Sequence, residues 1–288
     1  MNSITNKPLA ASMAPTINIS LIHNHDAARL SLIRPAIYCL QQYLGGEAHC
    51  KILESSFQPE LKPHPWALAL KRDVIYAQLG YAWSFYRGYG HTPVRSTLGF
   101  LKRFFGKYVF NYQESRNRWF RSSAIEVFVS AKHVRMWEAF LESDAELLIC
   151  FEDDALFNDE SHQQFLQHIS RLLDNPSENY VYVDFGGGCT LEQLKIDRLQ
   201  LDFQGGVRRY KRGVTNTACS YLLNRNLAAE FLQVLLNRPQ LRLVGIDWMM
   251  NALFMEIRRS GGSVECWHCD PPAVQHGSAV GSFDPWQR

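Results

Sequence analysis

The hydrophobic and polar positions of this chain alternate between strand-like and helix-like patterns from residue 16 onward. Apolar and polar residues alternate over residues 16–22, which predicts a strand. Residues 27–44 carry apolar side chains every three or four positions, which predicts a helix, and residues 49–53 form another strand-like segment. Strand, helix and strand in this order are typical of the start of a parallel α/β sheet.

Later segments continue the alternation. Short apolar runs at residues 147–151 and 180–184 predict strands that are buried on both faces. Further strands are predicted at residues 216–224 and 264–267, and helices at residues 122–143 (after an initial strand or turn), 161–173, 227–236 and from Gly245 onward. We therefore predict a Rossmann-like α/β fold with a mixed, mostly parallel sheet and helices on both faces.

Composition supports one globular domain and shows one uneven charge distribution. The chain is 46% hydrophobic and 20% charged. Residues 1–15 are small and polar and predict a loose tail, and residues 16–288 form the predicted domain. The net charge is only +2, but residues 92–121 contain seven Lys or Arg and one Glu, which makes this segment +6.

The basic segment belongs to an insertion at about residues 57–121 in which aromatic residues alternate with cations. Such a surface could lie on an anionic membrane, or it could hold a nucleic acid or a phosphate-rich acceptor. The alternative is a helical insertion whose aromatic side chains pack in the core and whose cations are simply solvated. The composition leaves these interpretations open.

The first residues lack the pattern of a secretion signal, and no apolar run reaches the roughly 18–20 residues that span a bilayer. We therefore expect a cytoplasmic protein, and its seven cysteines should be reduced thiols. Cys266 and Cys269 form a lone Cys-x-x-Cys pair, which is half of a structural zinc site and does not precede a predicted helix. We expect neither a zinc role nor a redox role for this pair.

Three acids end the apolar run at residues 147–151: Glu152, Asp153 and Asp154. Ligands of open α/β sheets bind at the carboxyl ends of the strands. Carboxylates in that position suit Mn²⁺ or Mg²⁺. The alternative is an acidic turn that only solubilises the strand end. Asp184 ends another strand and precedes three glycines, which more often form a turn than a phosphate-binding loop.

The segment from Glu126 to His133, the following Trp137 and the Glu152–Asp153–Asp154 triplet together resemble glycosyltransferase family 25. This family contains bacterial lipooligosaccharide and lipopolysaccharide galactosyltransferases. Residues 217–223, 244–248 and 271–278 also resemble its sequence blocks. The chain departs from the family pattern at Phe128 and Lys132.

The resemblance implies a GT-A-like fold, a nucleotide-sugar donor, a divalent metal ion and inversion at the sugar carbon. It implies Asp154, Glu152 and His276 as metal ligands, although a single histidine can equally be an ordinary surface or core residue. It places Asp153, His133, Lys132, Arg29 and Asp184 near the donor. Asp247 is the implied general base, with a helix cap as the alternative, and Trp248 is a candidate surface for stacking on the acceptor sugar.

The predicted function is transfer of a hexose, with galactose from UDP-galactose as the first choice, to a lipooligosaccharide, lipopolysaccharide or capsular glycan. Such a protein would be cytoplasmic or peripheral on the inner membrane, and we do not expect a nucleic-acid partner. Two alternatives use the same residues differently. One is a metal-dependent phosphoester hydrolase or nuclease, and the other is a non-catalytic glycan-binding module that would explain the departures at Phe128 and Lys132.

Overall fold

The computed structural model describes residues 16–55, 92–108, 124–157, 165–170, 179–191, 199–243 and 245–283. The predicted tail and most of the aromatic insertion lie outside these ranges. The helices are α1 (Ala27–Tyr43), α4 (Pro93–Tyr108), α5 (Ala124–Glu142), α8 (Arg225–Asn237) and α9 (Ile246–Arg259), with short 3₁₀ turns at Gly46–Ala48 and Pro239–Leu243. Residues 165–170 are also helical.

Eight strands form the main sheet: β1 (Ile17–Ile22), β2 (Cys50–Ser55), β3 (Leu147–Glu152), β5 (Tyr180–Asp184), β7 (Gln200–Gln204), β8 (Val207–Tyr210), β9 (Ser220–Asn224) and β10 (Val264–Cys269). Their order is β2-β1-β3-β9-β5-β10-β8-β7. Three neighbouring pairs are parallel (β1 with β2, β1 with β3, β5 with β10), and the other four are antiparallel. The sheet is mixed, as predicted, but the prediction of a mostly parallel sheet is wrong.

The antiparallel pairs have two origins. The backbone N–H of Glu152 donates to the carbonyl oxygen of Cys219, so β9 starts at the carboxyl end of β3 and runs back between β3 and β5. β7 and β8 form a hairpin that turns at Gly205 and Gly206, both with positive φ, as a tight two-residue turn requires. An apolar run reports burial on both faces but not strand direction, which is why the sequence pattern misses this reversal.

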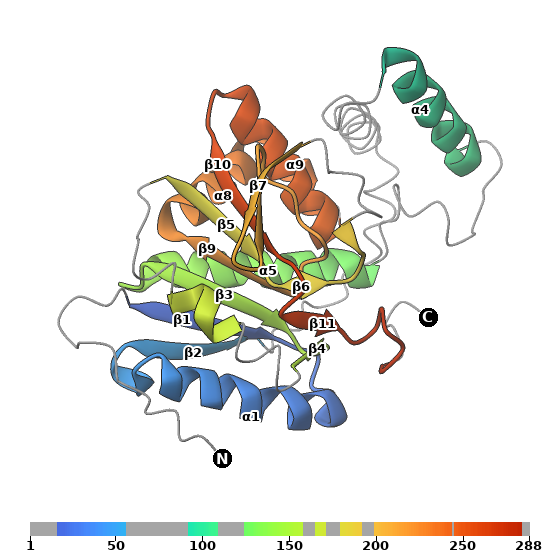
Figure 1. Cartoon of the computed structure of the whole chain (residues 1–288). Coiled ribbons are helices and arrows are strands. Elements are labelled where there is room, and N and C mark those ends of the chain that lie inside the picture. The colour runs from blue at the N-terminus through green and yellow to red at the C-terminus, as the bar shows by residue number, and fades with distance from the viewer. Residues whose placement is uncertain are drawn as a thin grey trace.

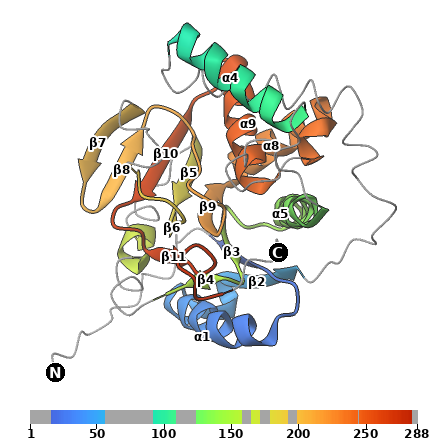
Figure 2. The ribbon, with the colours of Figure 1, turned by 90° about the vertical axis from the view of Figure 1, so that its right-hand side faces the viewer.

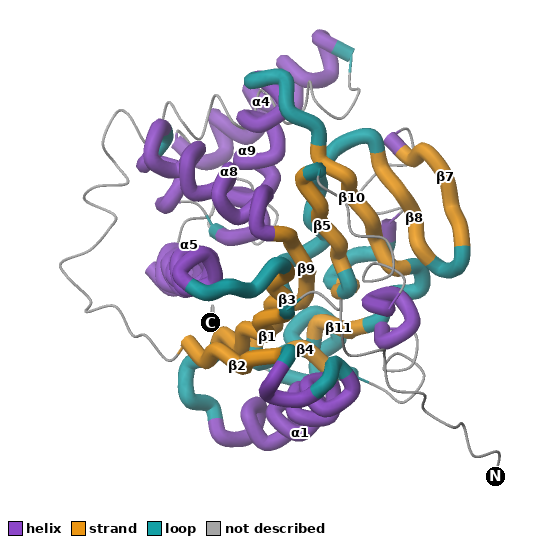
Figure 3. The backbone as a smooth tube through the Cα atoms, turned by 90° about the vertical axis from the view of Figure 1, so that its left-hand side faces the viewer, coloured by secondary structure: helices purple, strands orange, loops and turns teal. Residues whose placement is uncertain are grey.

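Two hydrophobic layers enclose the sheet. Leu148 and Cys150 of β3 face a core that includes Trp137 of α5 and residues of α8 and α9. Ile149 and Phe151 face the opposite core, which includes the apolar side of α1. Figures 1 and 3 show α1 on one side of the sheet and α5, α8 and α9 on the other. The prediction of helices on both faces is therefore confirmed.

Several predicted elements differ in extent. α1 is one continuous helix despite Pro35, and its first turn is capped by the Asp26 carboxylate, which accepts from two backbone N–H groups. α5 begins at Ala124, so the strand or turn predicted at its start is instead helical from that residue on. β9 is shorter than predicted, because residues 216–219 form a loop before it. None of the described helices combines the length and apolar character that a membrane span needs.

A small second sheet lies beside the carboxyl ends of β3 and β5. It consists of β4 (Ala155–Leu156), β11 (Val274–His276) and β6 (Gly186–Gly187) in that order. β4 follows β3 directly and β6 follows β5 directly, so β11 brings the C-terminal segment to the edge where both buried strands end (Figure 2). This arrangement positions the site described next.

Candidate metal centre

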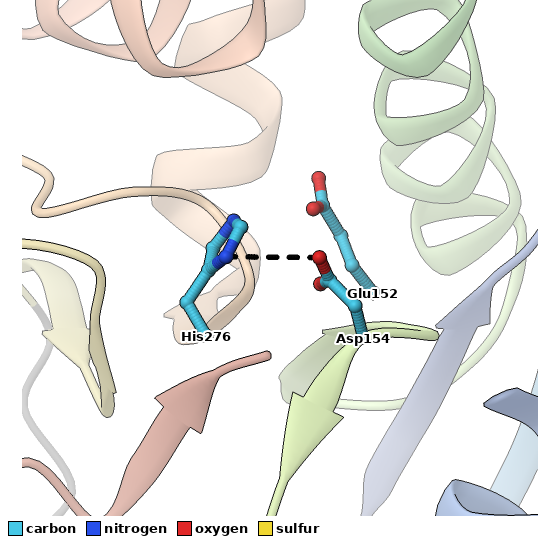
Figure 4. Close-up of side chains that lie close together, drawn as sticks. All are labelled: Glu152, Asp154 and His276. Carbon is cyan, nitrogen blue, oxygen red and sulfur yellow. Dashed lines mark ion pairs between the residues drawn. The ribbon is translucent and has the colours of Figure 1, made fainter. Parts of the chain in front are cut away.

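Glu152, Asp154 and His276 converge at the carboxyl edge of the sheet. Each offers one ligand atom, and these three atoms lie within 4.8 Å of one another. Nδ1 of His276 is 3.6 Å from Oδ2 of Asp154. Figure 4 shows the Glu152 carboxylate at the end of β3, the Asp154 carboxylate in the following turn and the His276 imidazole of β11 directed into the same space. The sequence prediction that these three residues form one group agrees with this geometry.

The C-terminal segment is fixed against Asp154 by its backbone as well as by its side chains. β11 pairs with β4 so that His276 lies opposite Ala155. The backbone N–H of Gly277 donates to the carbonyl oxygen of Asp154 at 2.8 Å, and the Ser278 hydroxyl donates to the Asp154 carboxylate. These contacts explain how a residue 122 positions away in the sequence reaches the acidic turn.

The donor set fits a divalent cation. Within the described part of the chain, Oδ1 of Asp154 is buried and has no hydrogen-bond partner, which is costly for a carboxylate oxygen unless something binds it. Burial and the neighbouring Asp154 carboxylate raise the pKa of Glu152 well above its usual range. A cation would neutralise this repulsion and displace the proton from Glu152. Two carboxylates and an imidazole suit Mn²⁺ better than Mg²⁺, which prefers oxygen ligands alone.

A buried hydrogen-bond network fixes the position of the Glu152 side chain. Nε2 of His133 is 3.0 Å from Oε1 of Glu152, and Nδ1 is 2.8 Å from the Tyr221 hydroxyl. The indole N–H of Trp137 can only donate, and it does so to the Tyr221 oxygen at 2.9 Å. Tyr221 can then donate its own hydrogen to Nδ1, which leaves the imidazole hydrogen on Nε2, directed at Glu152.

The family resemblance implies a position near the donor for His133, and the structure shows it in contact with Glu152, a candidate metal ligand. Trp137 and residues 217–223, which include Tyr221, belong to the family resemblance. Trp137 is linked to His133 only through the Tyr221 hydroxyl. No local signal reveals this network, because its members come from α5, β3 and β9 and meet only in the folded chain.

Asp153 is not part of the candidate ligand group and instead forms a buried ion pair. Its Oδ1 atom accepts from Arg29 at 3.2 Å, and both side chains are buried. The Arg29 guanidinium also lies over the Phe283 ring, 5.0 Å from its centroid. Lys132 is buried too, and its ammonium group donates to the His23 carbonyl oxygen at 2.6 Å and to the Asn24 side chain. Contact of these three side chains with a donor stays a prediction.

Asp247 lies in the first turn of α9 but does not cap it. Gly245 occupies the N-cap position, and Oδ1 of Asp247 accepts from the backbone N–H of Ala218 at 2.6 Å. The cap alternative is therefore wrong. Burial raises the pKa of Asp247, while the nearby His276, the Ala218 N–H and His133 lower it. Trp248 follows it and is partly buried against the core.

The loop that contacts Asp247 contains a strained residue. Thr217 has φ of +79°, a conformation that β-branched residues rarely adopt. A Cβ atom added at Gly188 would lie 2.2 Å from Cγ2 of Thr217, and one added at Gly186 would lie 2.5 Å from Sγ of Cys219. The glycines thus allow the strand after β5 to pack against this loop. Close packing, rather than phosphate binding, explains them.

Asp184 is fully enclosed beside the same loop. Its Oδ2 atom accepts from the Tyr182 hydroxyl at 2.9 Å, the Thr215 hydroxyl at 3.2 Å and the backbone N–H of Asn216 at 2.7 Å. Burial nevertheless raises the pKa of Asp184 to about 7. No sequence pattern marks Thr215 and Asn216 as partners of Asp184. The assignment of Asp184 to the donor site stays a prediction.

Cys266 and Cys269 do not form a site. Both are buried free thiols, and they belong to the hydrophobic cores on opposite faces of the sheet. The Cys266 thiol donates to the Val214 carbonyl oxygen at 3.5 Å. Because three positions along a strand reverse the direction of the side chain, the two sulfur atoms cannot share a metal ion.

Comparison with known proteins adds little to this geometry. No protein-family profile matches the sequence, and no curated protein matches it. One similar solved structure is a glycosyltransferase involved in the glycosylation of the major capsid of PBCV-1, at 8% identity and a TM-score of 0.29, over 78% of this chain and 68% of that chain. A likeness at this level carries no argument, so membership of family 25 stays a prediction. Fold and site define an α/β protein with a candidate divalent metal centre.

Proposed function

We propose that this chain is a metal-dependent glycosyltransferase with a GT-A-like fold. The observation that carries the proposal is the convergence of Glu152, Asp154 and His276 at the carboxyl edge of the sheet, with a buried Asp154 oxygen that lacks a partner among the described residues. Nucleotides bind at this edge in α/β sheets. Glycosyl transfer from a nucleoside diphosphate requires neutralisation of the departing pyrophosphate, and a bound divalent cation would supply it.

The chain's own residues would prepare the site for that charge. Asp154, held by Ser278 and by the Gly277 N–H, offers its free oxygen in a fixed direction. His133 occupies one oxygen of Glu152 and leaves the other available as a ligand. His276 arrives on β11 from the C-terminal segment, so the ligand set is complete only when that segment is in place.

Asp247 is the proposed general base for the acceptor hydroxyl. Its raised pKa makes the carboxylate a stronger base than an exposed aspartate, and the Ala218 N–H fixes one of its oxygens. A correctly placed base contributes roughly 10²- to 10⁴-fold in rate. Inversion at the sugar carbon follows in this scheme, because an acceptor activated by a base attacks opposite the leaving group.

Donor and acceptor are inferred from the sequence resemblance. We propose a UDP-hexose donor, with UDP-galactose first, and a lipooligosaccharide, lipopolysaccharide or capsular glycan acceptor. Arg29, Asp153, Lys132 and Asp184 would support the donor side, and Trp248 would stack on the acceptor sugar. The protein would act in the cytoplasm or at the inner membrane surface.

A screen of nucleotide sugars by thermal shift, with Mn²⁺ and with EDTA, tests this proposal. The expected result is stabilisation by one UDP-sugar in Mn²⁺ only, followed by release of UDP when an acceptor glycan is added. Cleavage of plasmid DNA or a phosphodiester with indifference to nucleotide sugars would instead identify a hydrolase. Glycan binding without turnover of any nucleotide sugar would identify a non-catalytic module.

A further inference from the structure

Helix α4 carries an exposed apolar face. Val94, Leu98 and Leu101 are 70%, 63% and 40% exposed, and Phe105 is 46% exposed. Their spacings of four, three and four residues place them on one side of the helix. α4 also lies outside the two helix layers that cover the sheet (Figure 1). A contiguous apolar face of this kind usually marks an interaction site.

The charge of the helix indicates what this face binds. α4 contains four Lys or Arg and no Asp or Glu among its 16 residues, and the wider segment 92–121 is +6. A second copy docked face to face would bring like charges together. A nucleic acid would use the cations but would gain nothing from exposed leucine and valine side chains. An anionic bilayer surface matches both features, because its headgroups attract cations and its acyl region accepts apolar side chains.

We propose that α4 binds the surface of an anionic lipid bilayer, lying parallel to it with Val94, Leu98 and Leu101 in the acyl region. The inference goes beyond glycosyl transfer and does not depend on it, since binding to vesicles needs neither donor nor cation. The sequence left membrane binding by residues 57–121 as one open interpretation. Here the apolar face of α4 inserts into the acyl region, and the cations contact the lipid headgroups.

Co-sedimentation of the intact chain with lipid vesicles tests the proposal. The neutral vesicles contain phosphatidylcholine alone, and the anionic vesicles contain phosphatidylcholine with 30% phosphatidylglycerol. The double variant Leu98→Glu/Leu101→Glu should lower the affinity for anionic vesicles by about tenfold or more, because each leucine loses its transfer into the apolar region. Arg95→Glu should lower it by about fivefold or more, the contribution expected of one cation near an anionic surface.

The controls are equally exposed residues of other elements. Leu236→Glu on α8 replaces a leucine that is 70% exposed, and Lys51→Glu on β2 reverses an exposed charge. Both should leave vesicle binding unchanged. Equal losses in the α4 variants and the controls, or equal binding to neutral and anionic vesicles, would overturn the proposal. A change of oligomeric mass in the Leu98→Glu/Leu101→Glu variant by light scattering would assign the face to a second copy instead. Normal transfer to a soluble acceptor by a variant that no longer binds vesicles separates this inference from the proposed function.

Discussion

The Asp154→Asn substitution should stabilise the metal-free protein and abolish its stabilisation by Mn²⁺. The ligand atoms of Asp154 and Glu152 lie within 4.8 Å of each other. Two unit charges 4.8 Å apart repel by about 3.5 kcal/mol at an effective dielectric constant of 20. Because the pKa of Glu152 is raised, proton uptake already relieves part of this repulsion at pH 7. The expected gain in unfolding free energy without metal is therefore about 1–2 kcal/mol.

Stabilisation of the protein by Mn²⁺ should require the Asp154 carboxylate. At a free cation concentration of about 100 times Kd, binding adds about 2.7 kcal/mol to the stability of the wild type, which raises Tm by roughly 5–10 °C. Asparagine keeps an acceptor for Ser278 but removes the charge that a cation requires. The variant should therefore show a higher Tm than the wild type in EDTA and no increase in Mn²⁺.

Both the stability without metal and the stabilisation by Mn²⁺ can be measured by thermal unfolding. The protein is unfolded in EDTA and in Mn²⁺ at ~10⁻⁴ to 10⁻² M, a range that brackets typical site affinities. Asp144→Asn makes the same change at an exposed aspartate ten positions away and should behave as the wild type does. An Asp154→Asn protein with the same Mn²⁺-dependent shift as the wild type would refute the metal assignment. A lower Tm in EDTA would refute the electrostatic reasoning.

Three further predictions concern the surroundings of the site. His133→Phe should weaken Mn²⁺ binding about 10- to 100-fold by isothermal titration, and His133→Gln, which keeps a donor, should weaken it less; unchanged affinity in the Phe variant would exclude a positioning role. The pKa of Asp184 is about 7 in the folded protein and lower in the unfolded chain. Between about pH 4 and 7 the folded protein therefore binds more protons than the unfolded chain does, so the stability of the protein falls as the pH rises through this window. Asp184→Asn should flatten this fall by up to roughly 1.4 kcal/mol per pH unit in urea titrations, and an unaltered slope would contradict the raised pKa. With a thiol reagent, Cys39 and Cys189 should react in the native protein and the five buried thiols only after unfolding, with or without EDTA; rapid reaction of Cys266 would contradict its burial.

The sequence predicts the elements of this protein better than their arrangement. Periodicity locates α1, α8 and the buried strands β3 and β5, because burial imposes a regular spacing on apolar residues. The direction of β9 and the β7–β8 hairpin are missed, since pairing between distant segments leaves no trace in a local pattern. The Gly205–Gly206 turn between β7 and β8 was the one available signal.

For the candidate site, too, the sequence indicates the residues better than their arrangement. The acidic triplet at a strand end was visible because charged residues after a buried strand are chemically conspicuous. The family resemblance supplied His276 and Asp247. What the sequence cannot supply is the separation of roles within the triplet: Glu152 and Asp154 face the site, whereas Asp153 pairs with Arg29. Alternation along the chain is consistent with this division, but only the fold shows which side is open.

Diffraction from crystals soaked in Mn²⁺ and UDP, recorded at the manganese absorption edge, tests the central claim most directly. The account predicts one anomalous peak among Glu152, Asp154 and His276, about 2.0–2.3 Å from their ligand atoms, with the pyrophosphate of UDP on its open side. Bound UDP without an anomalous peak at these residues, or manganese only at unrelated surface carboxylates, would contradict it.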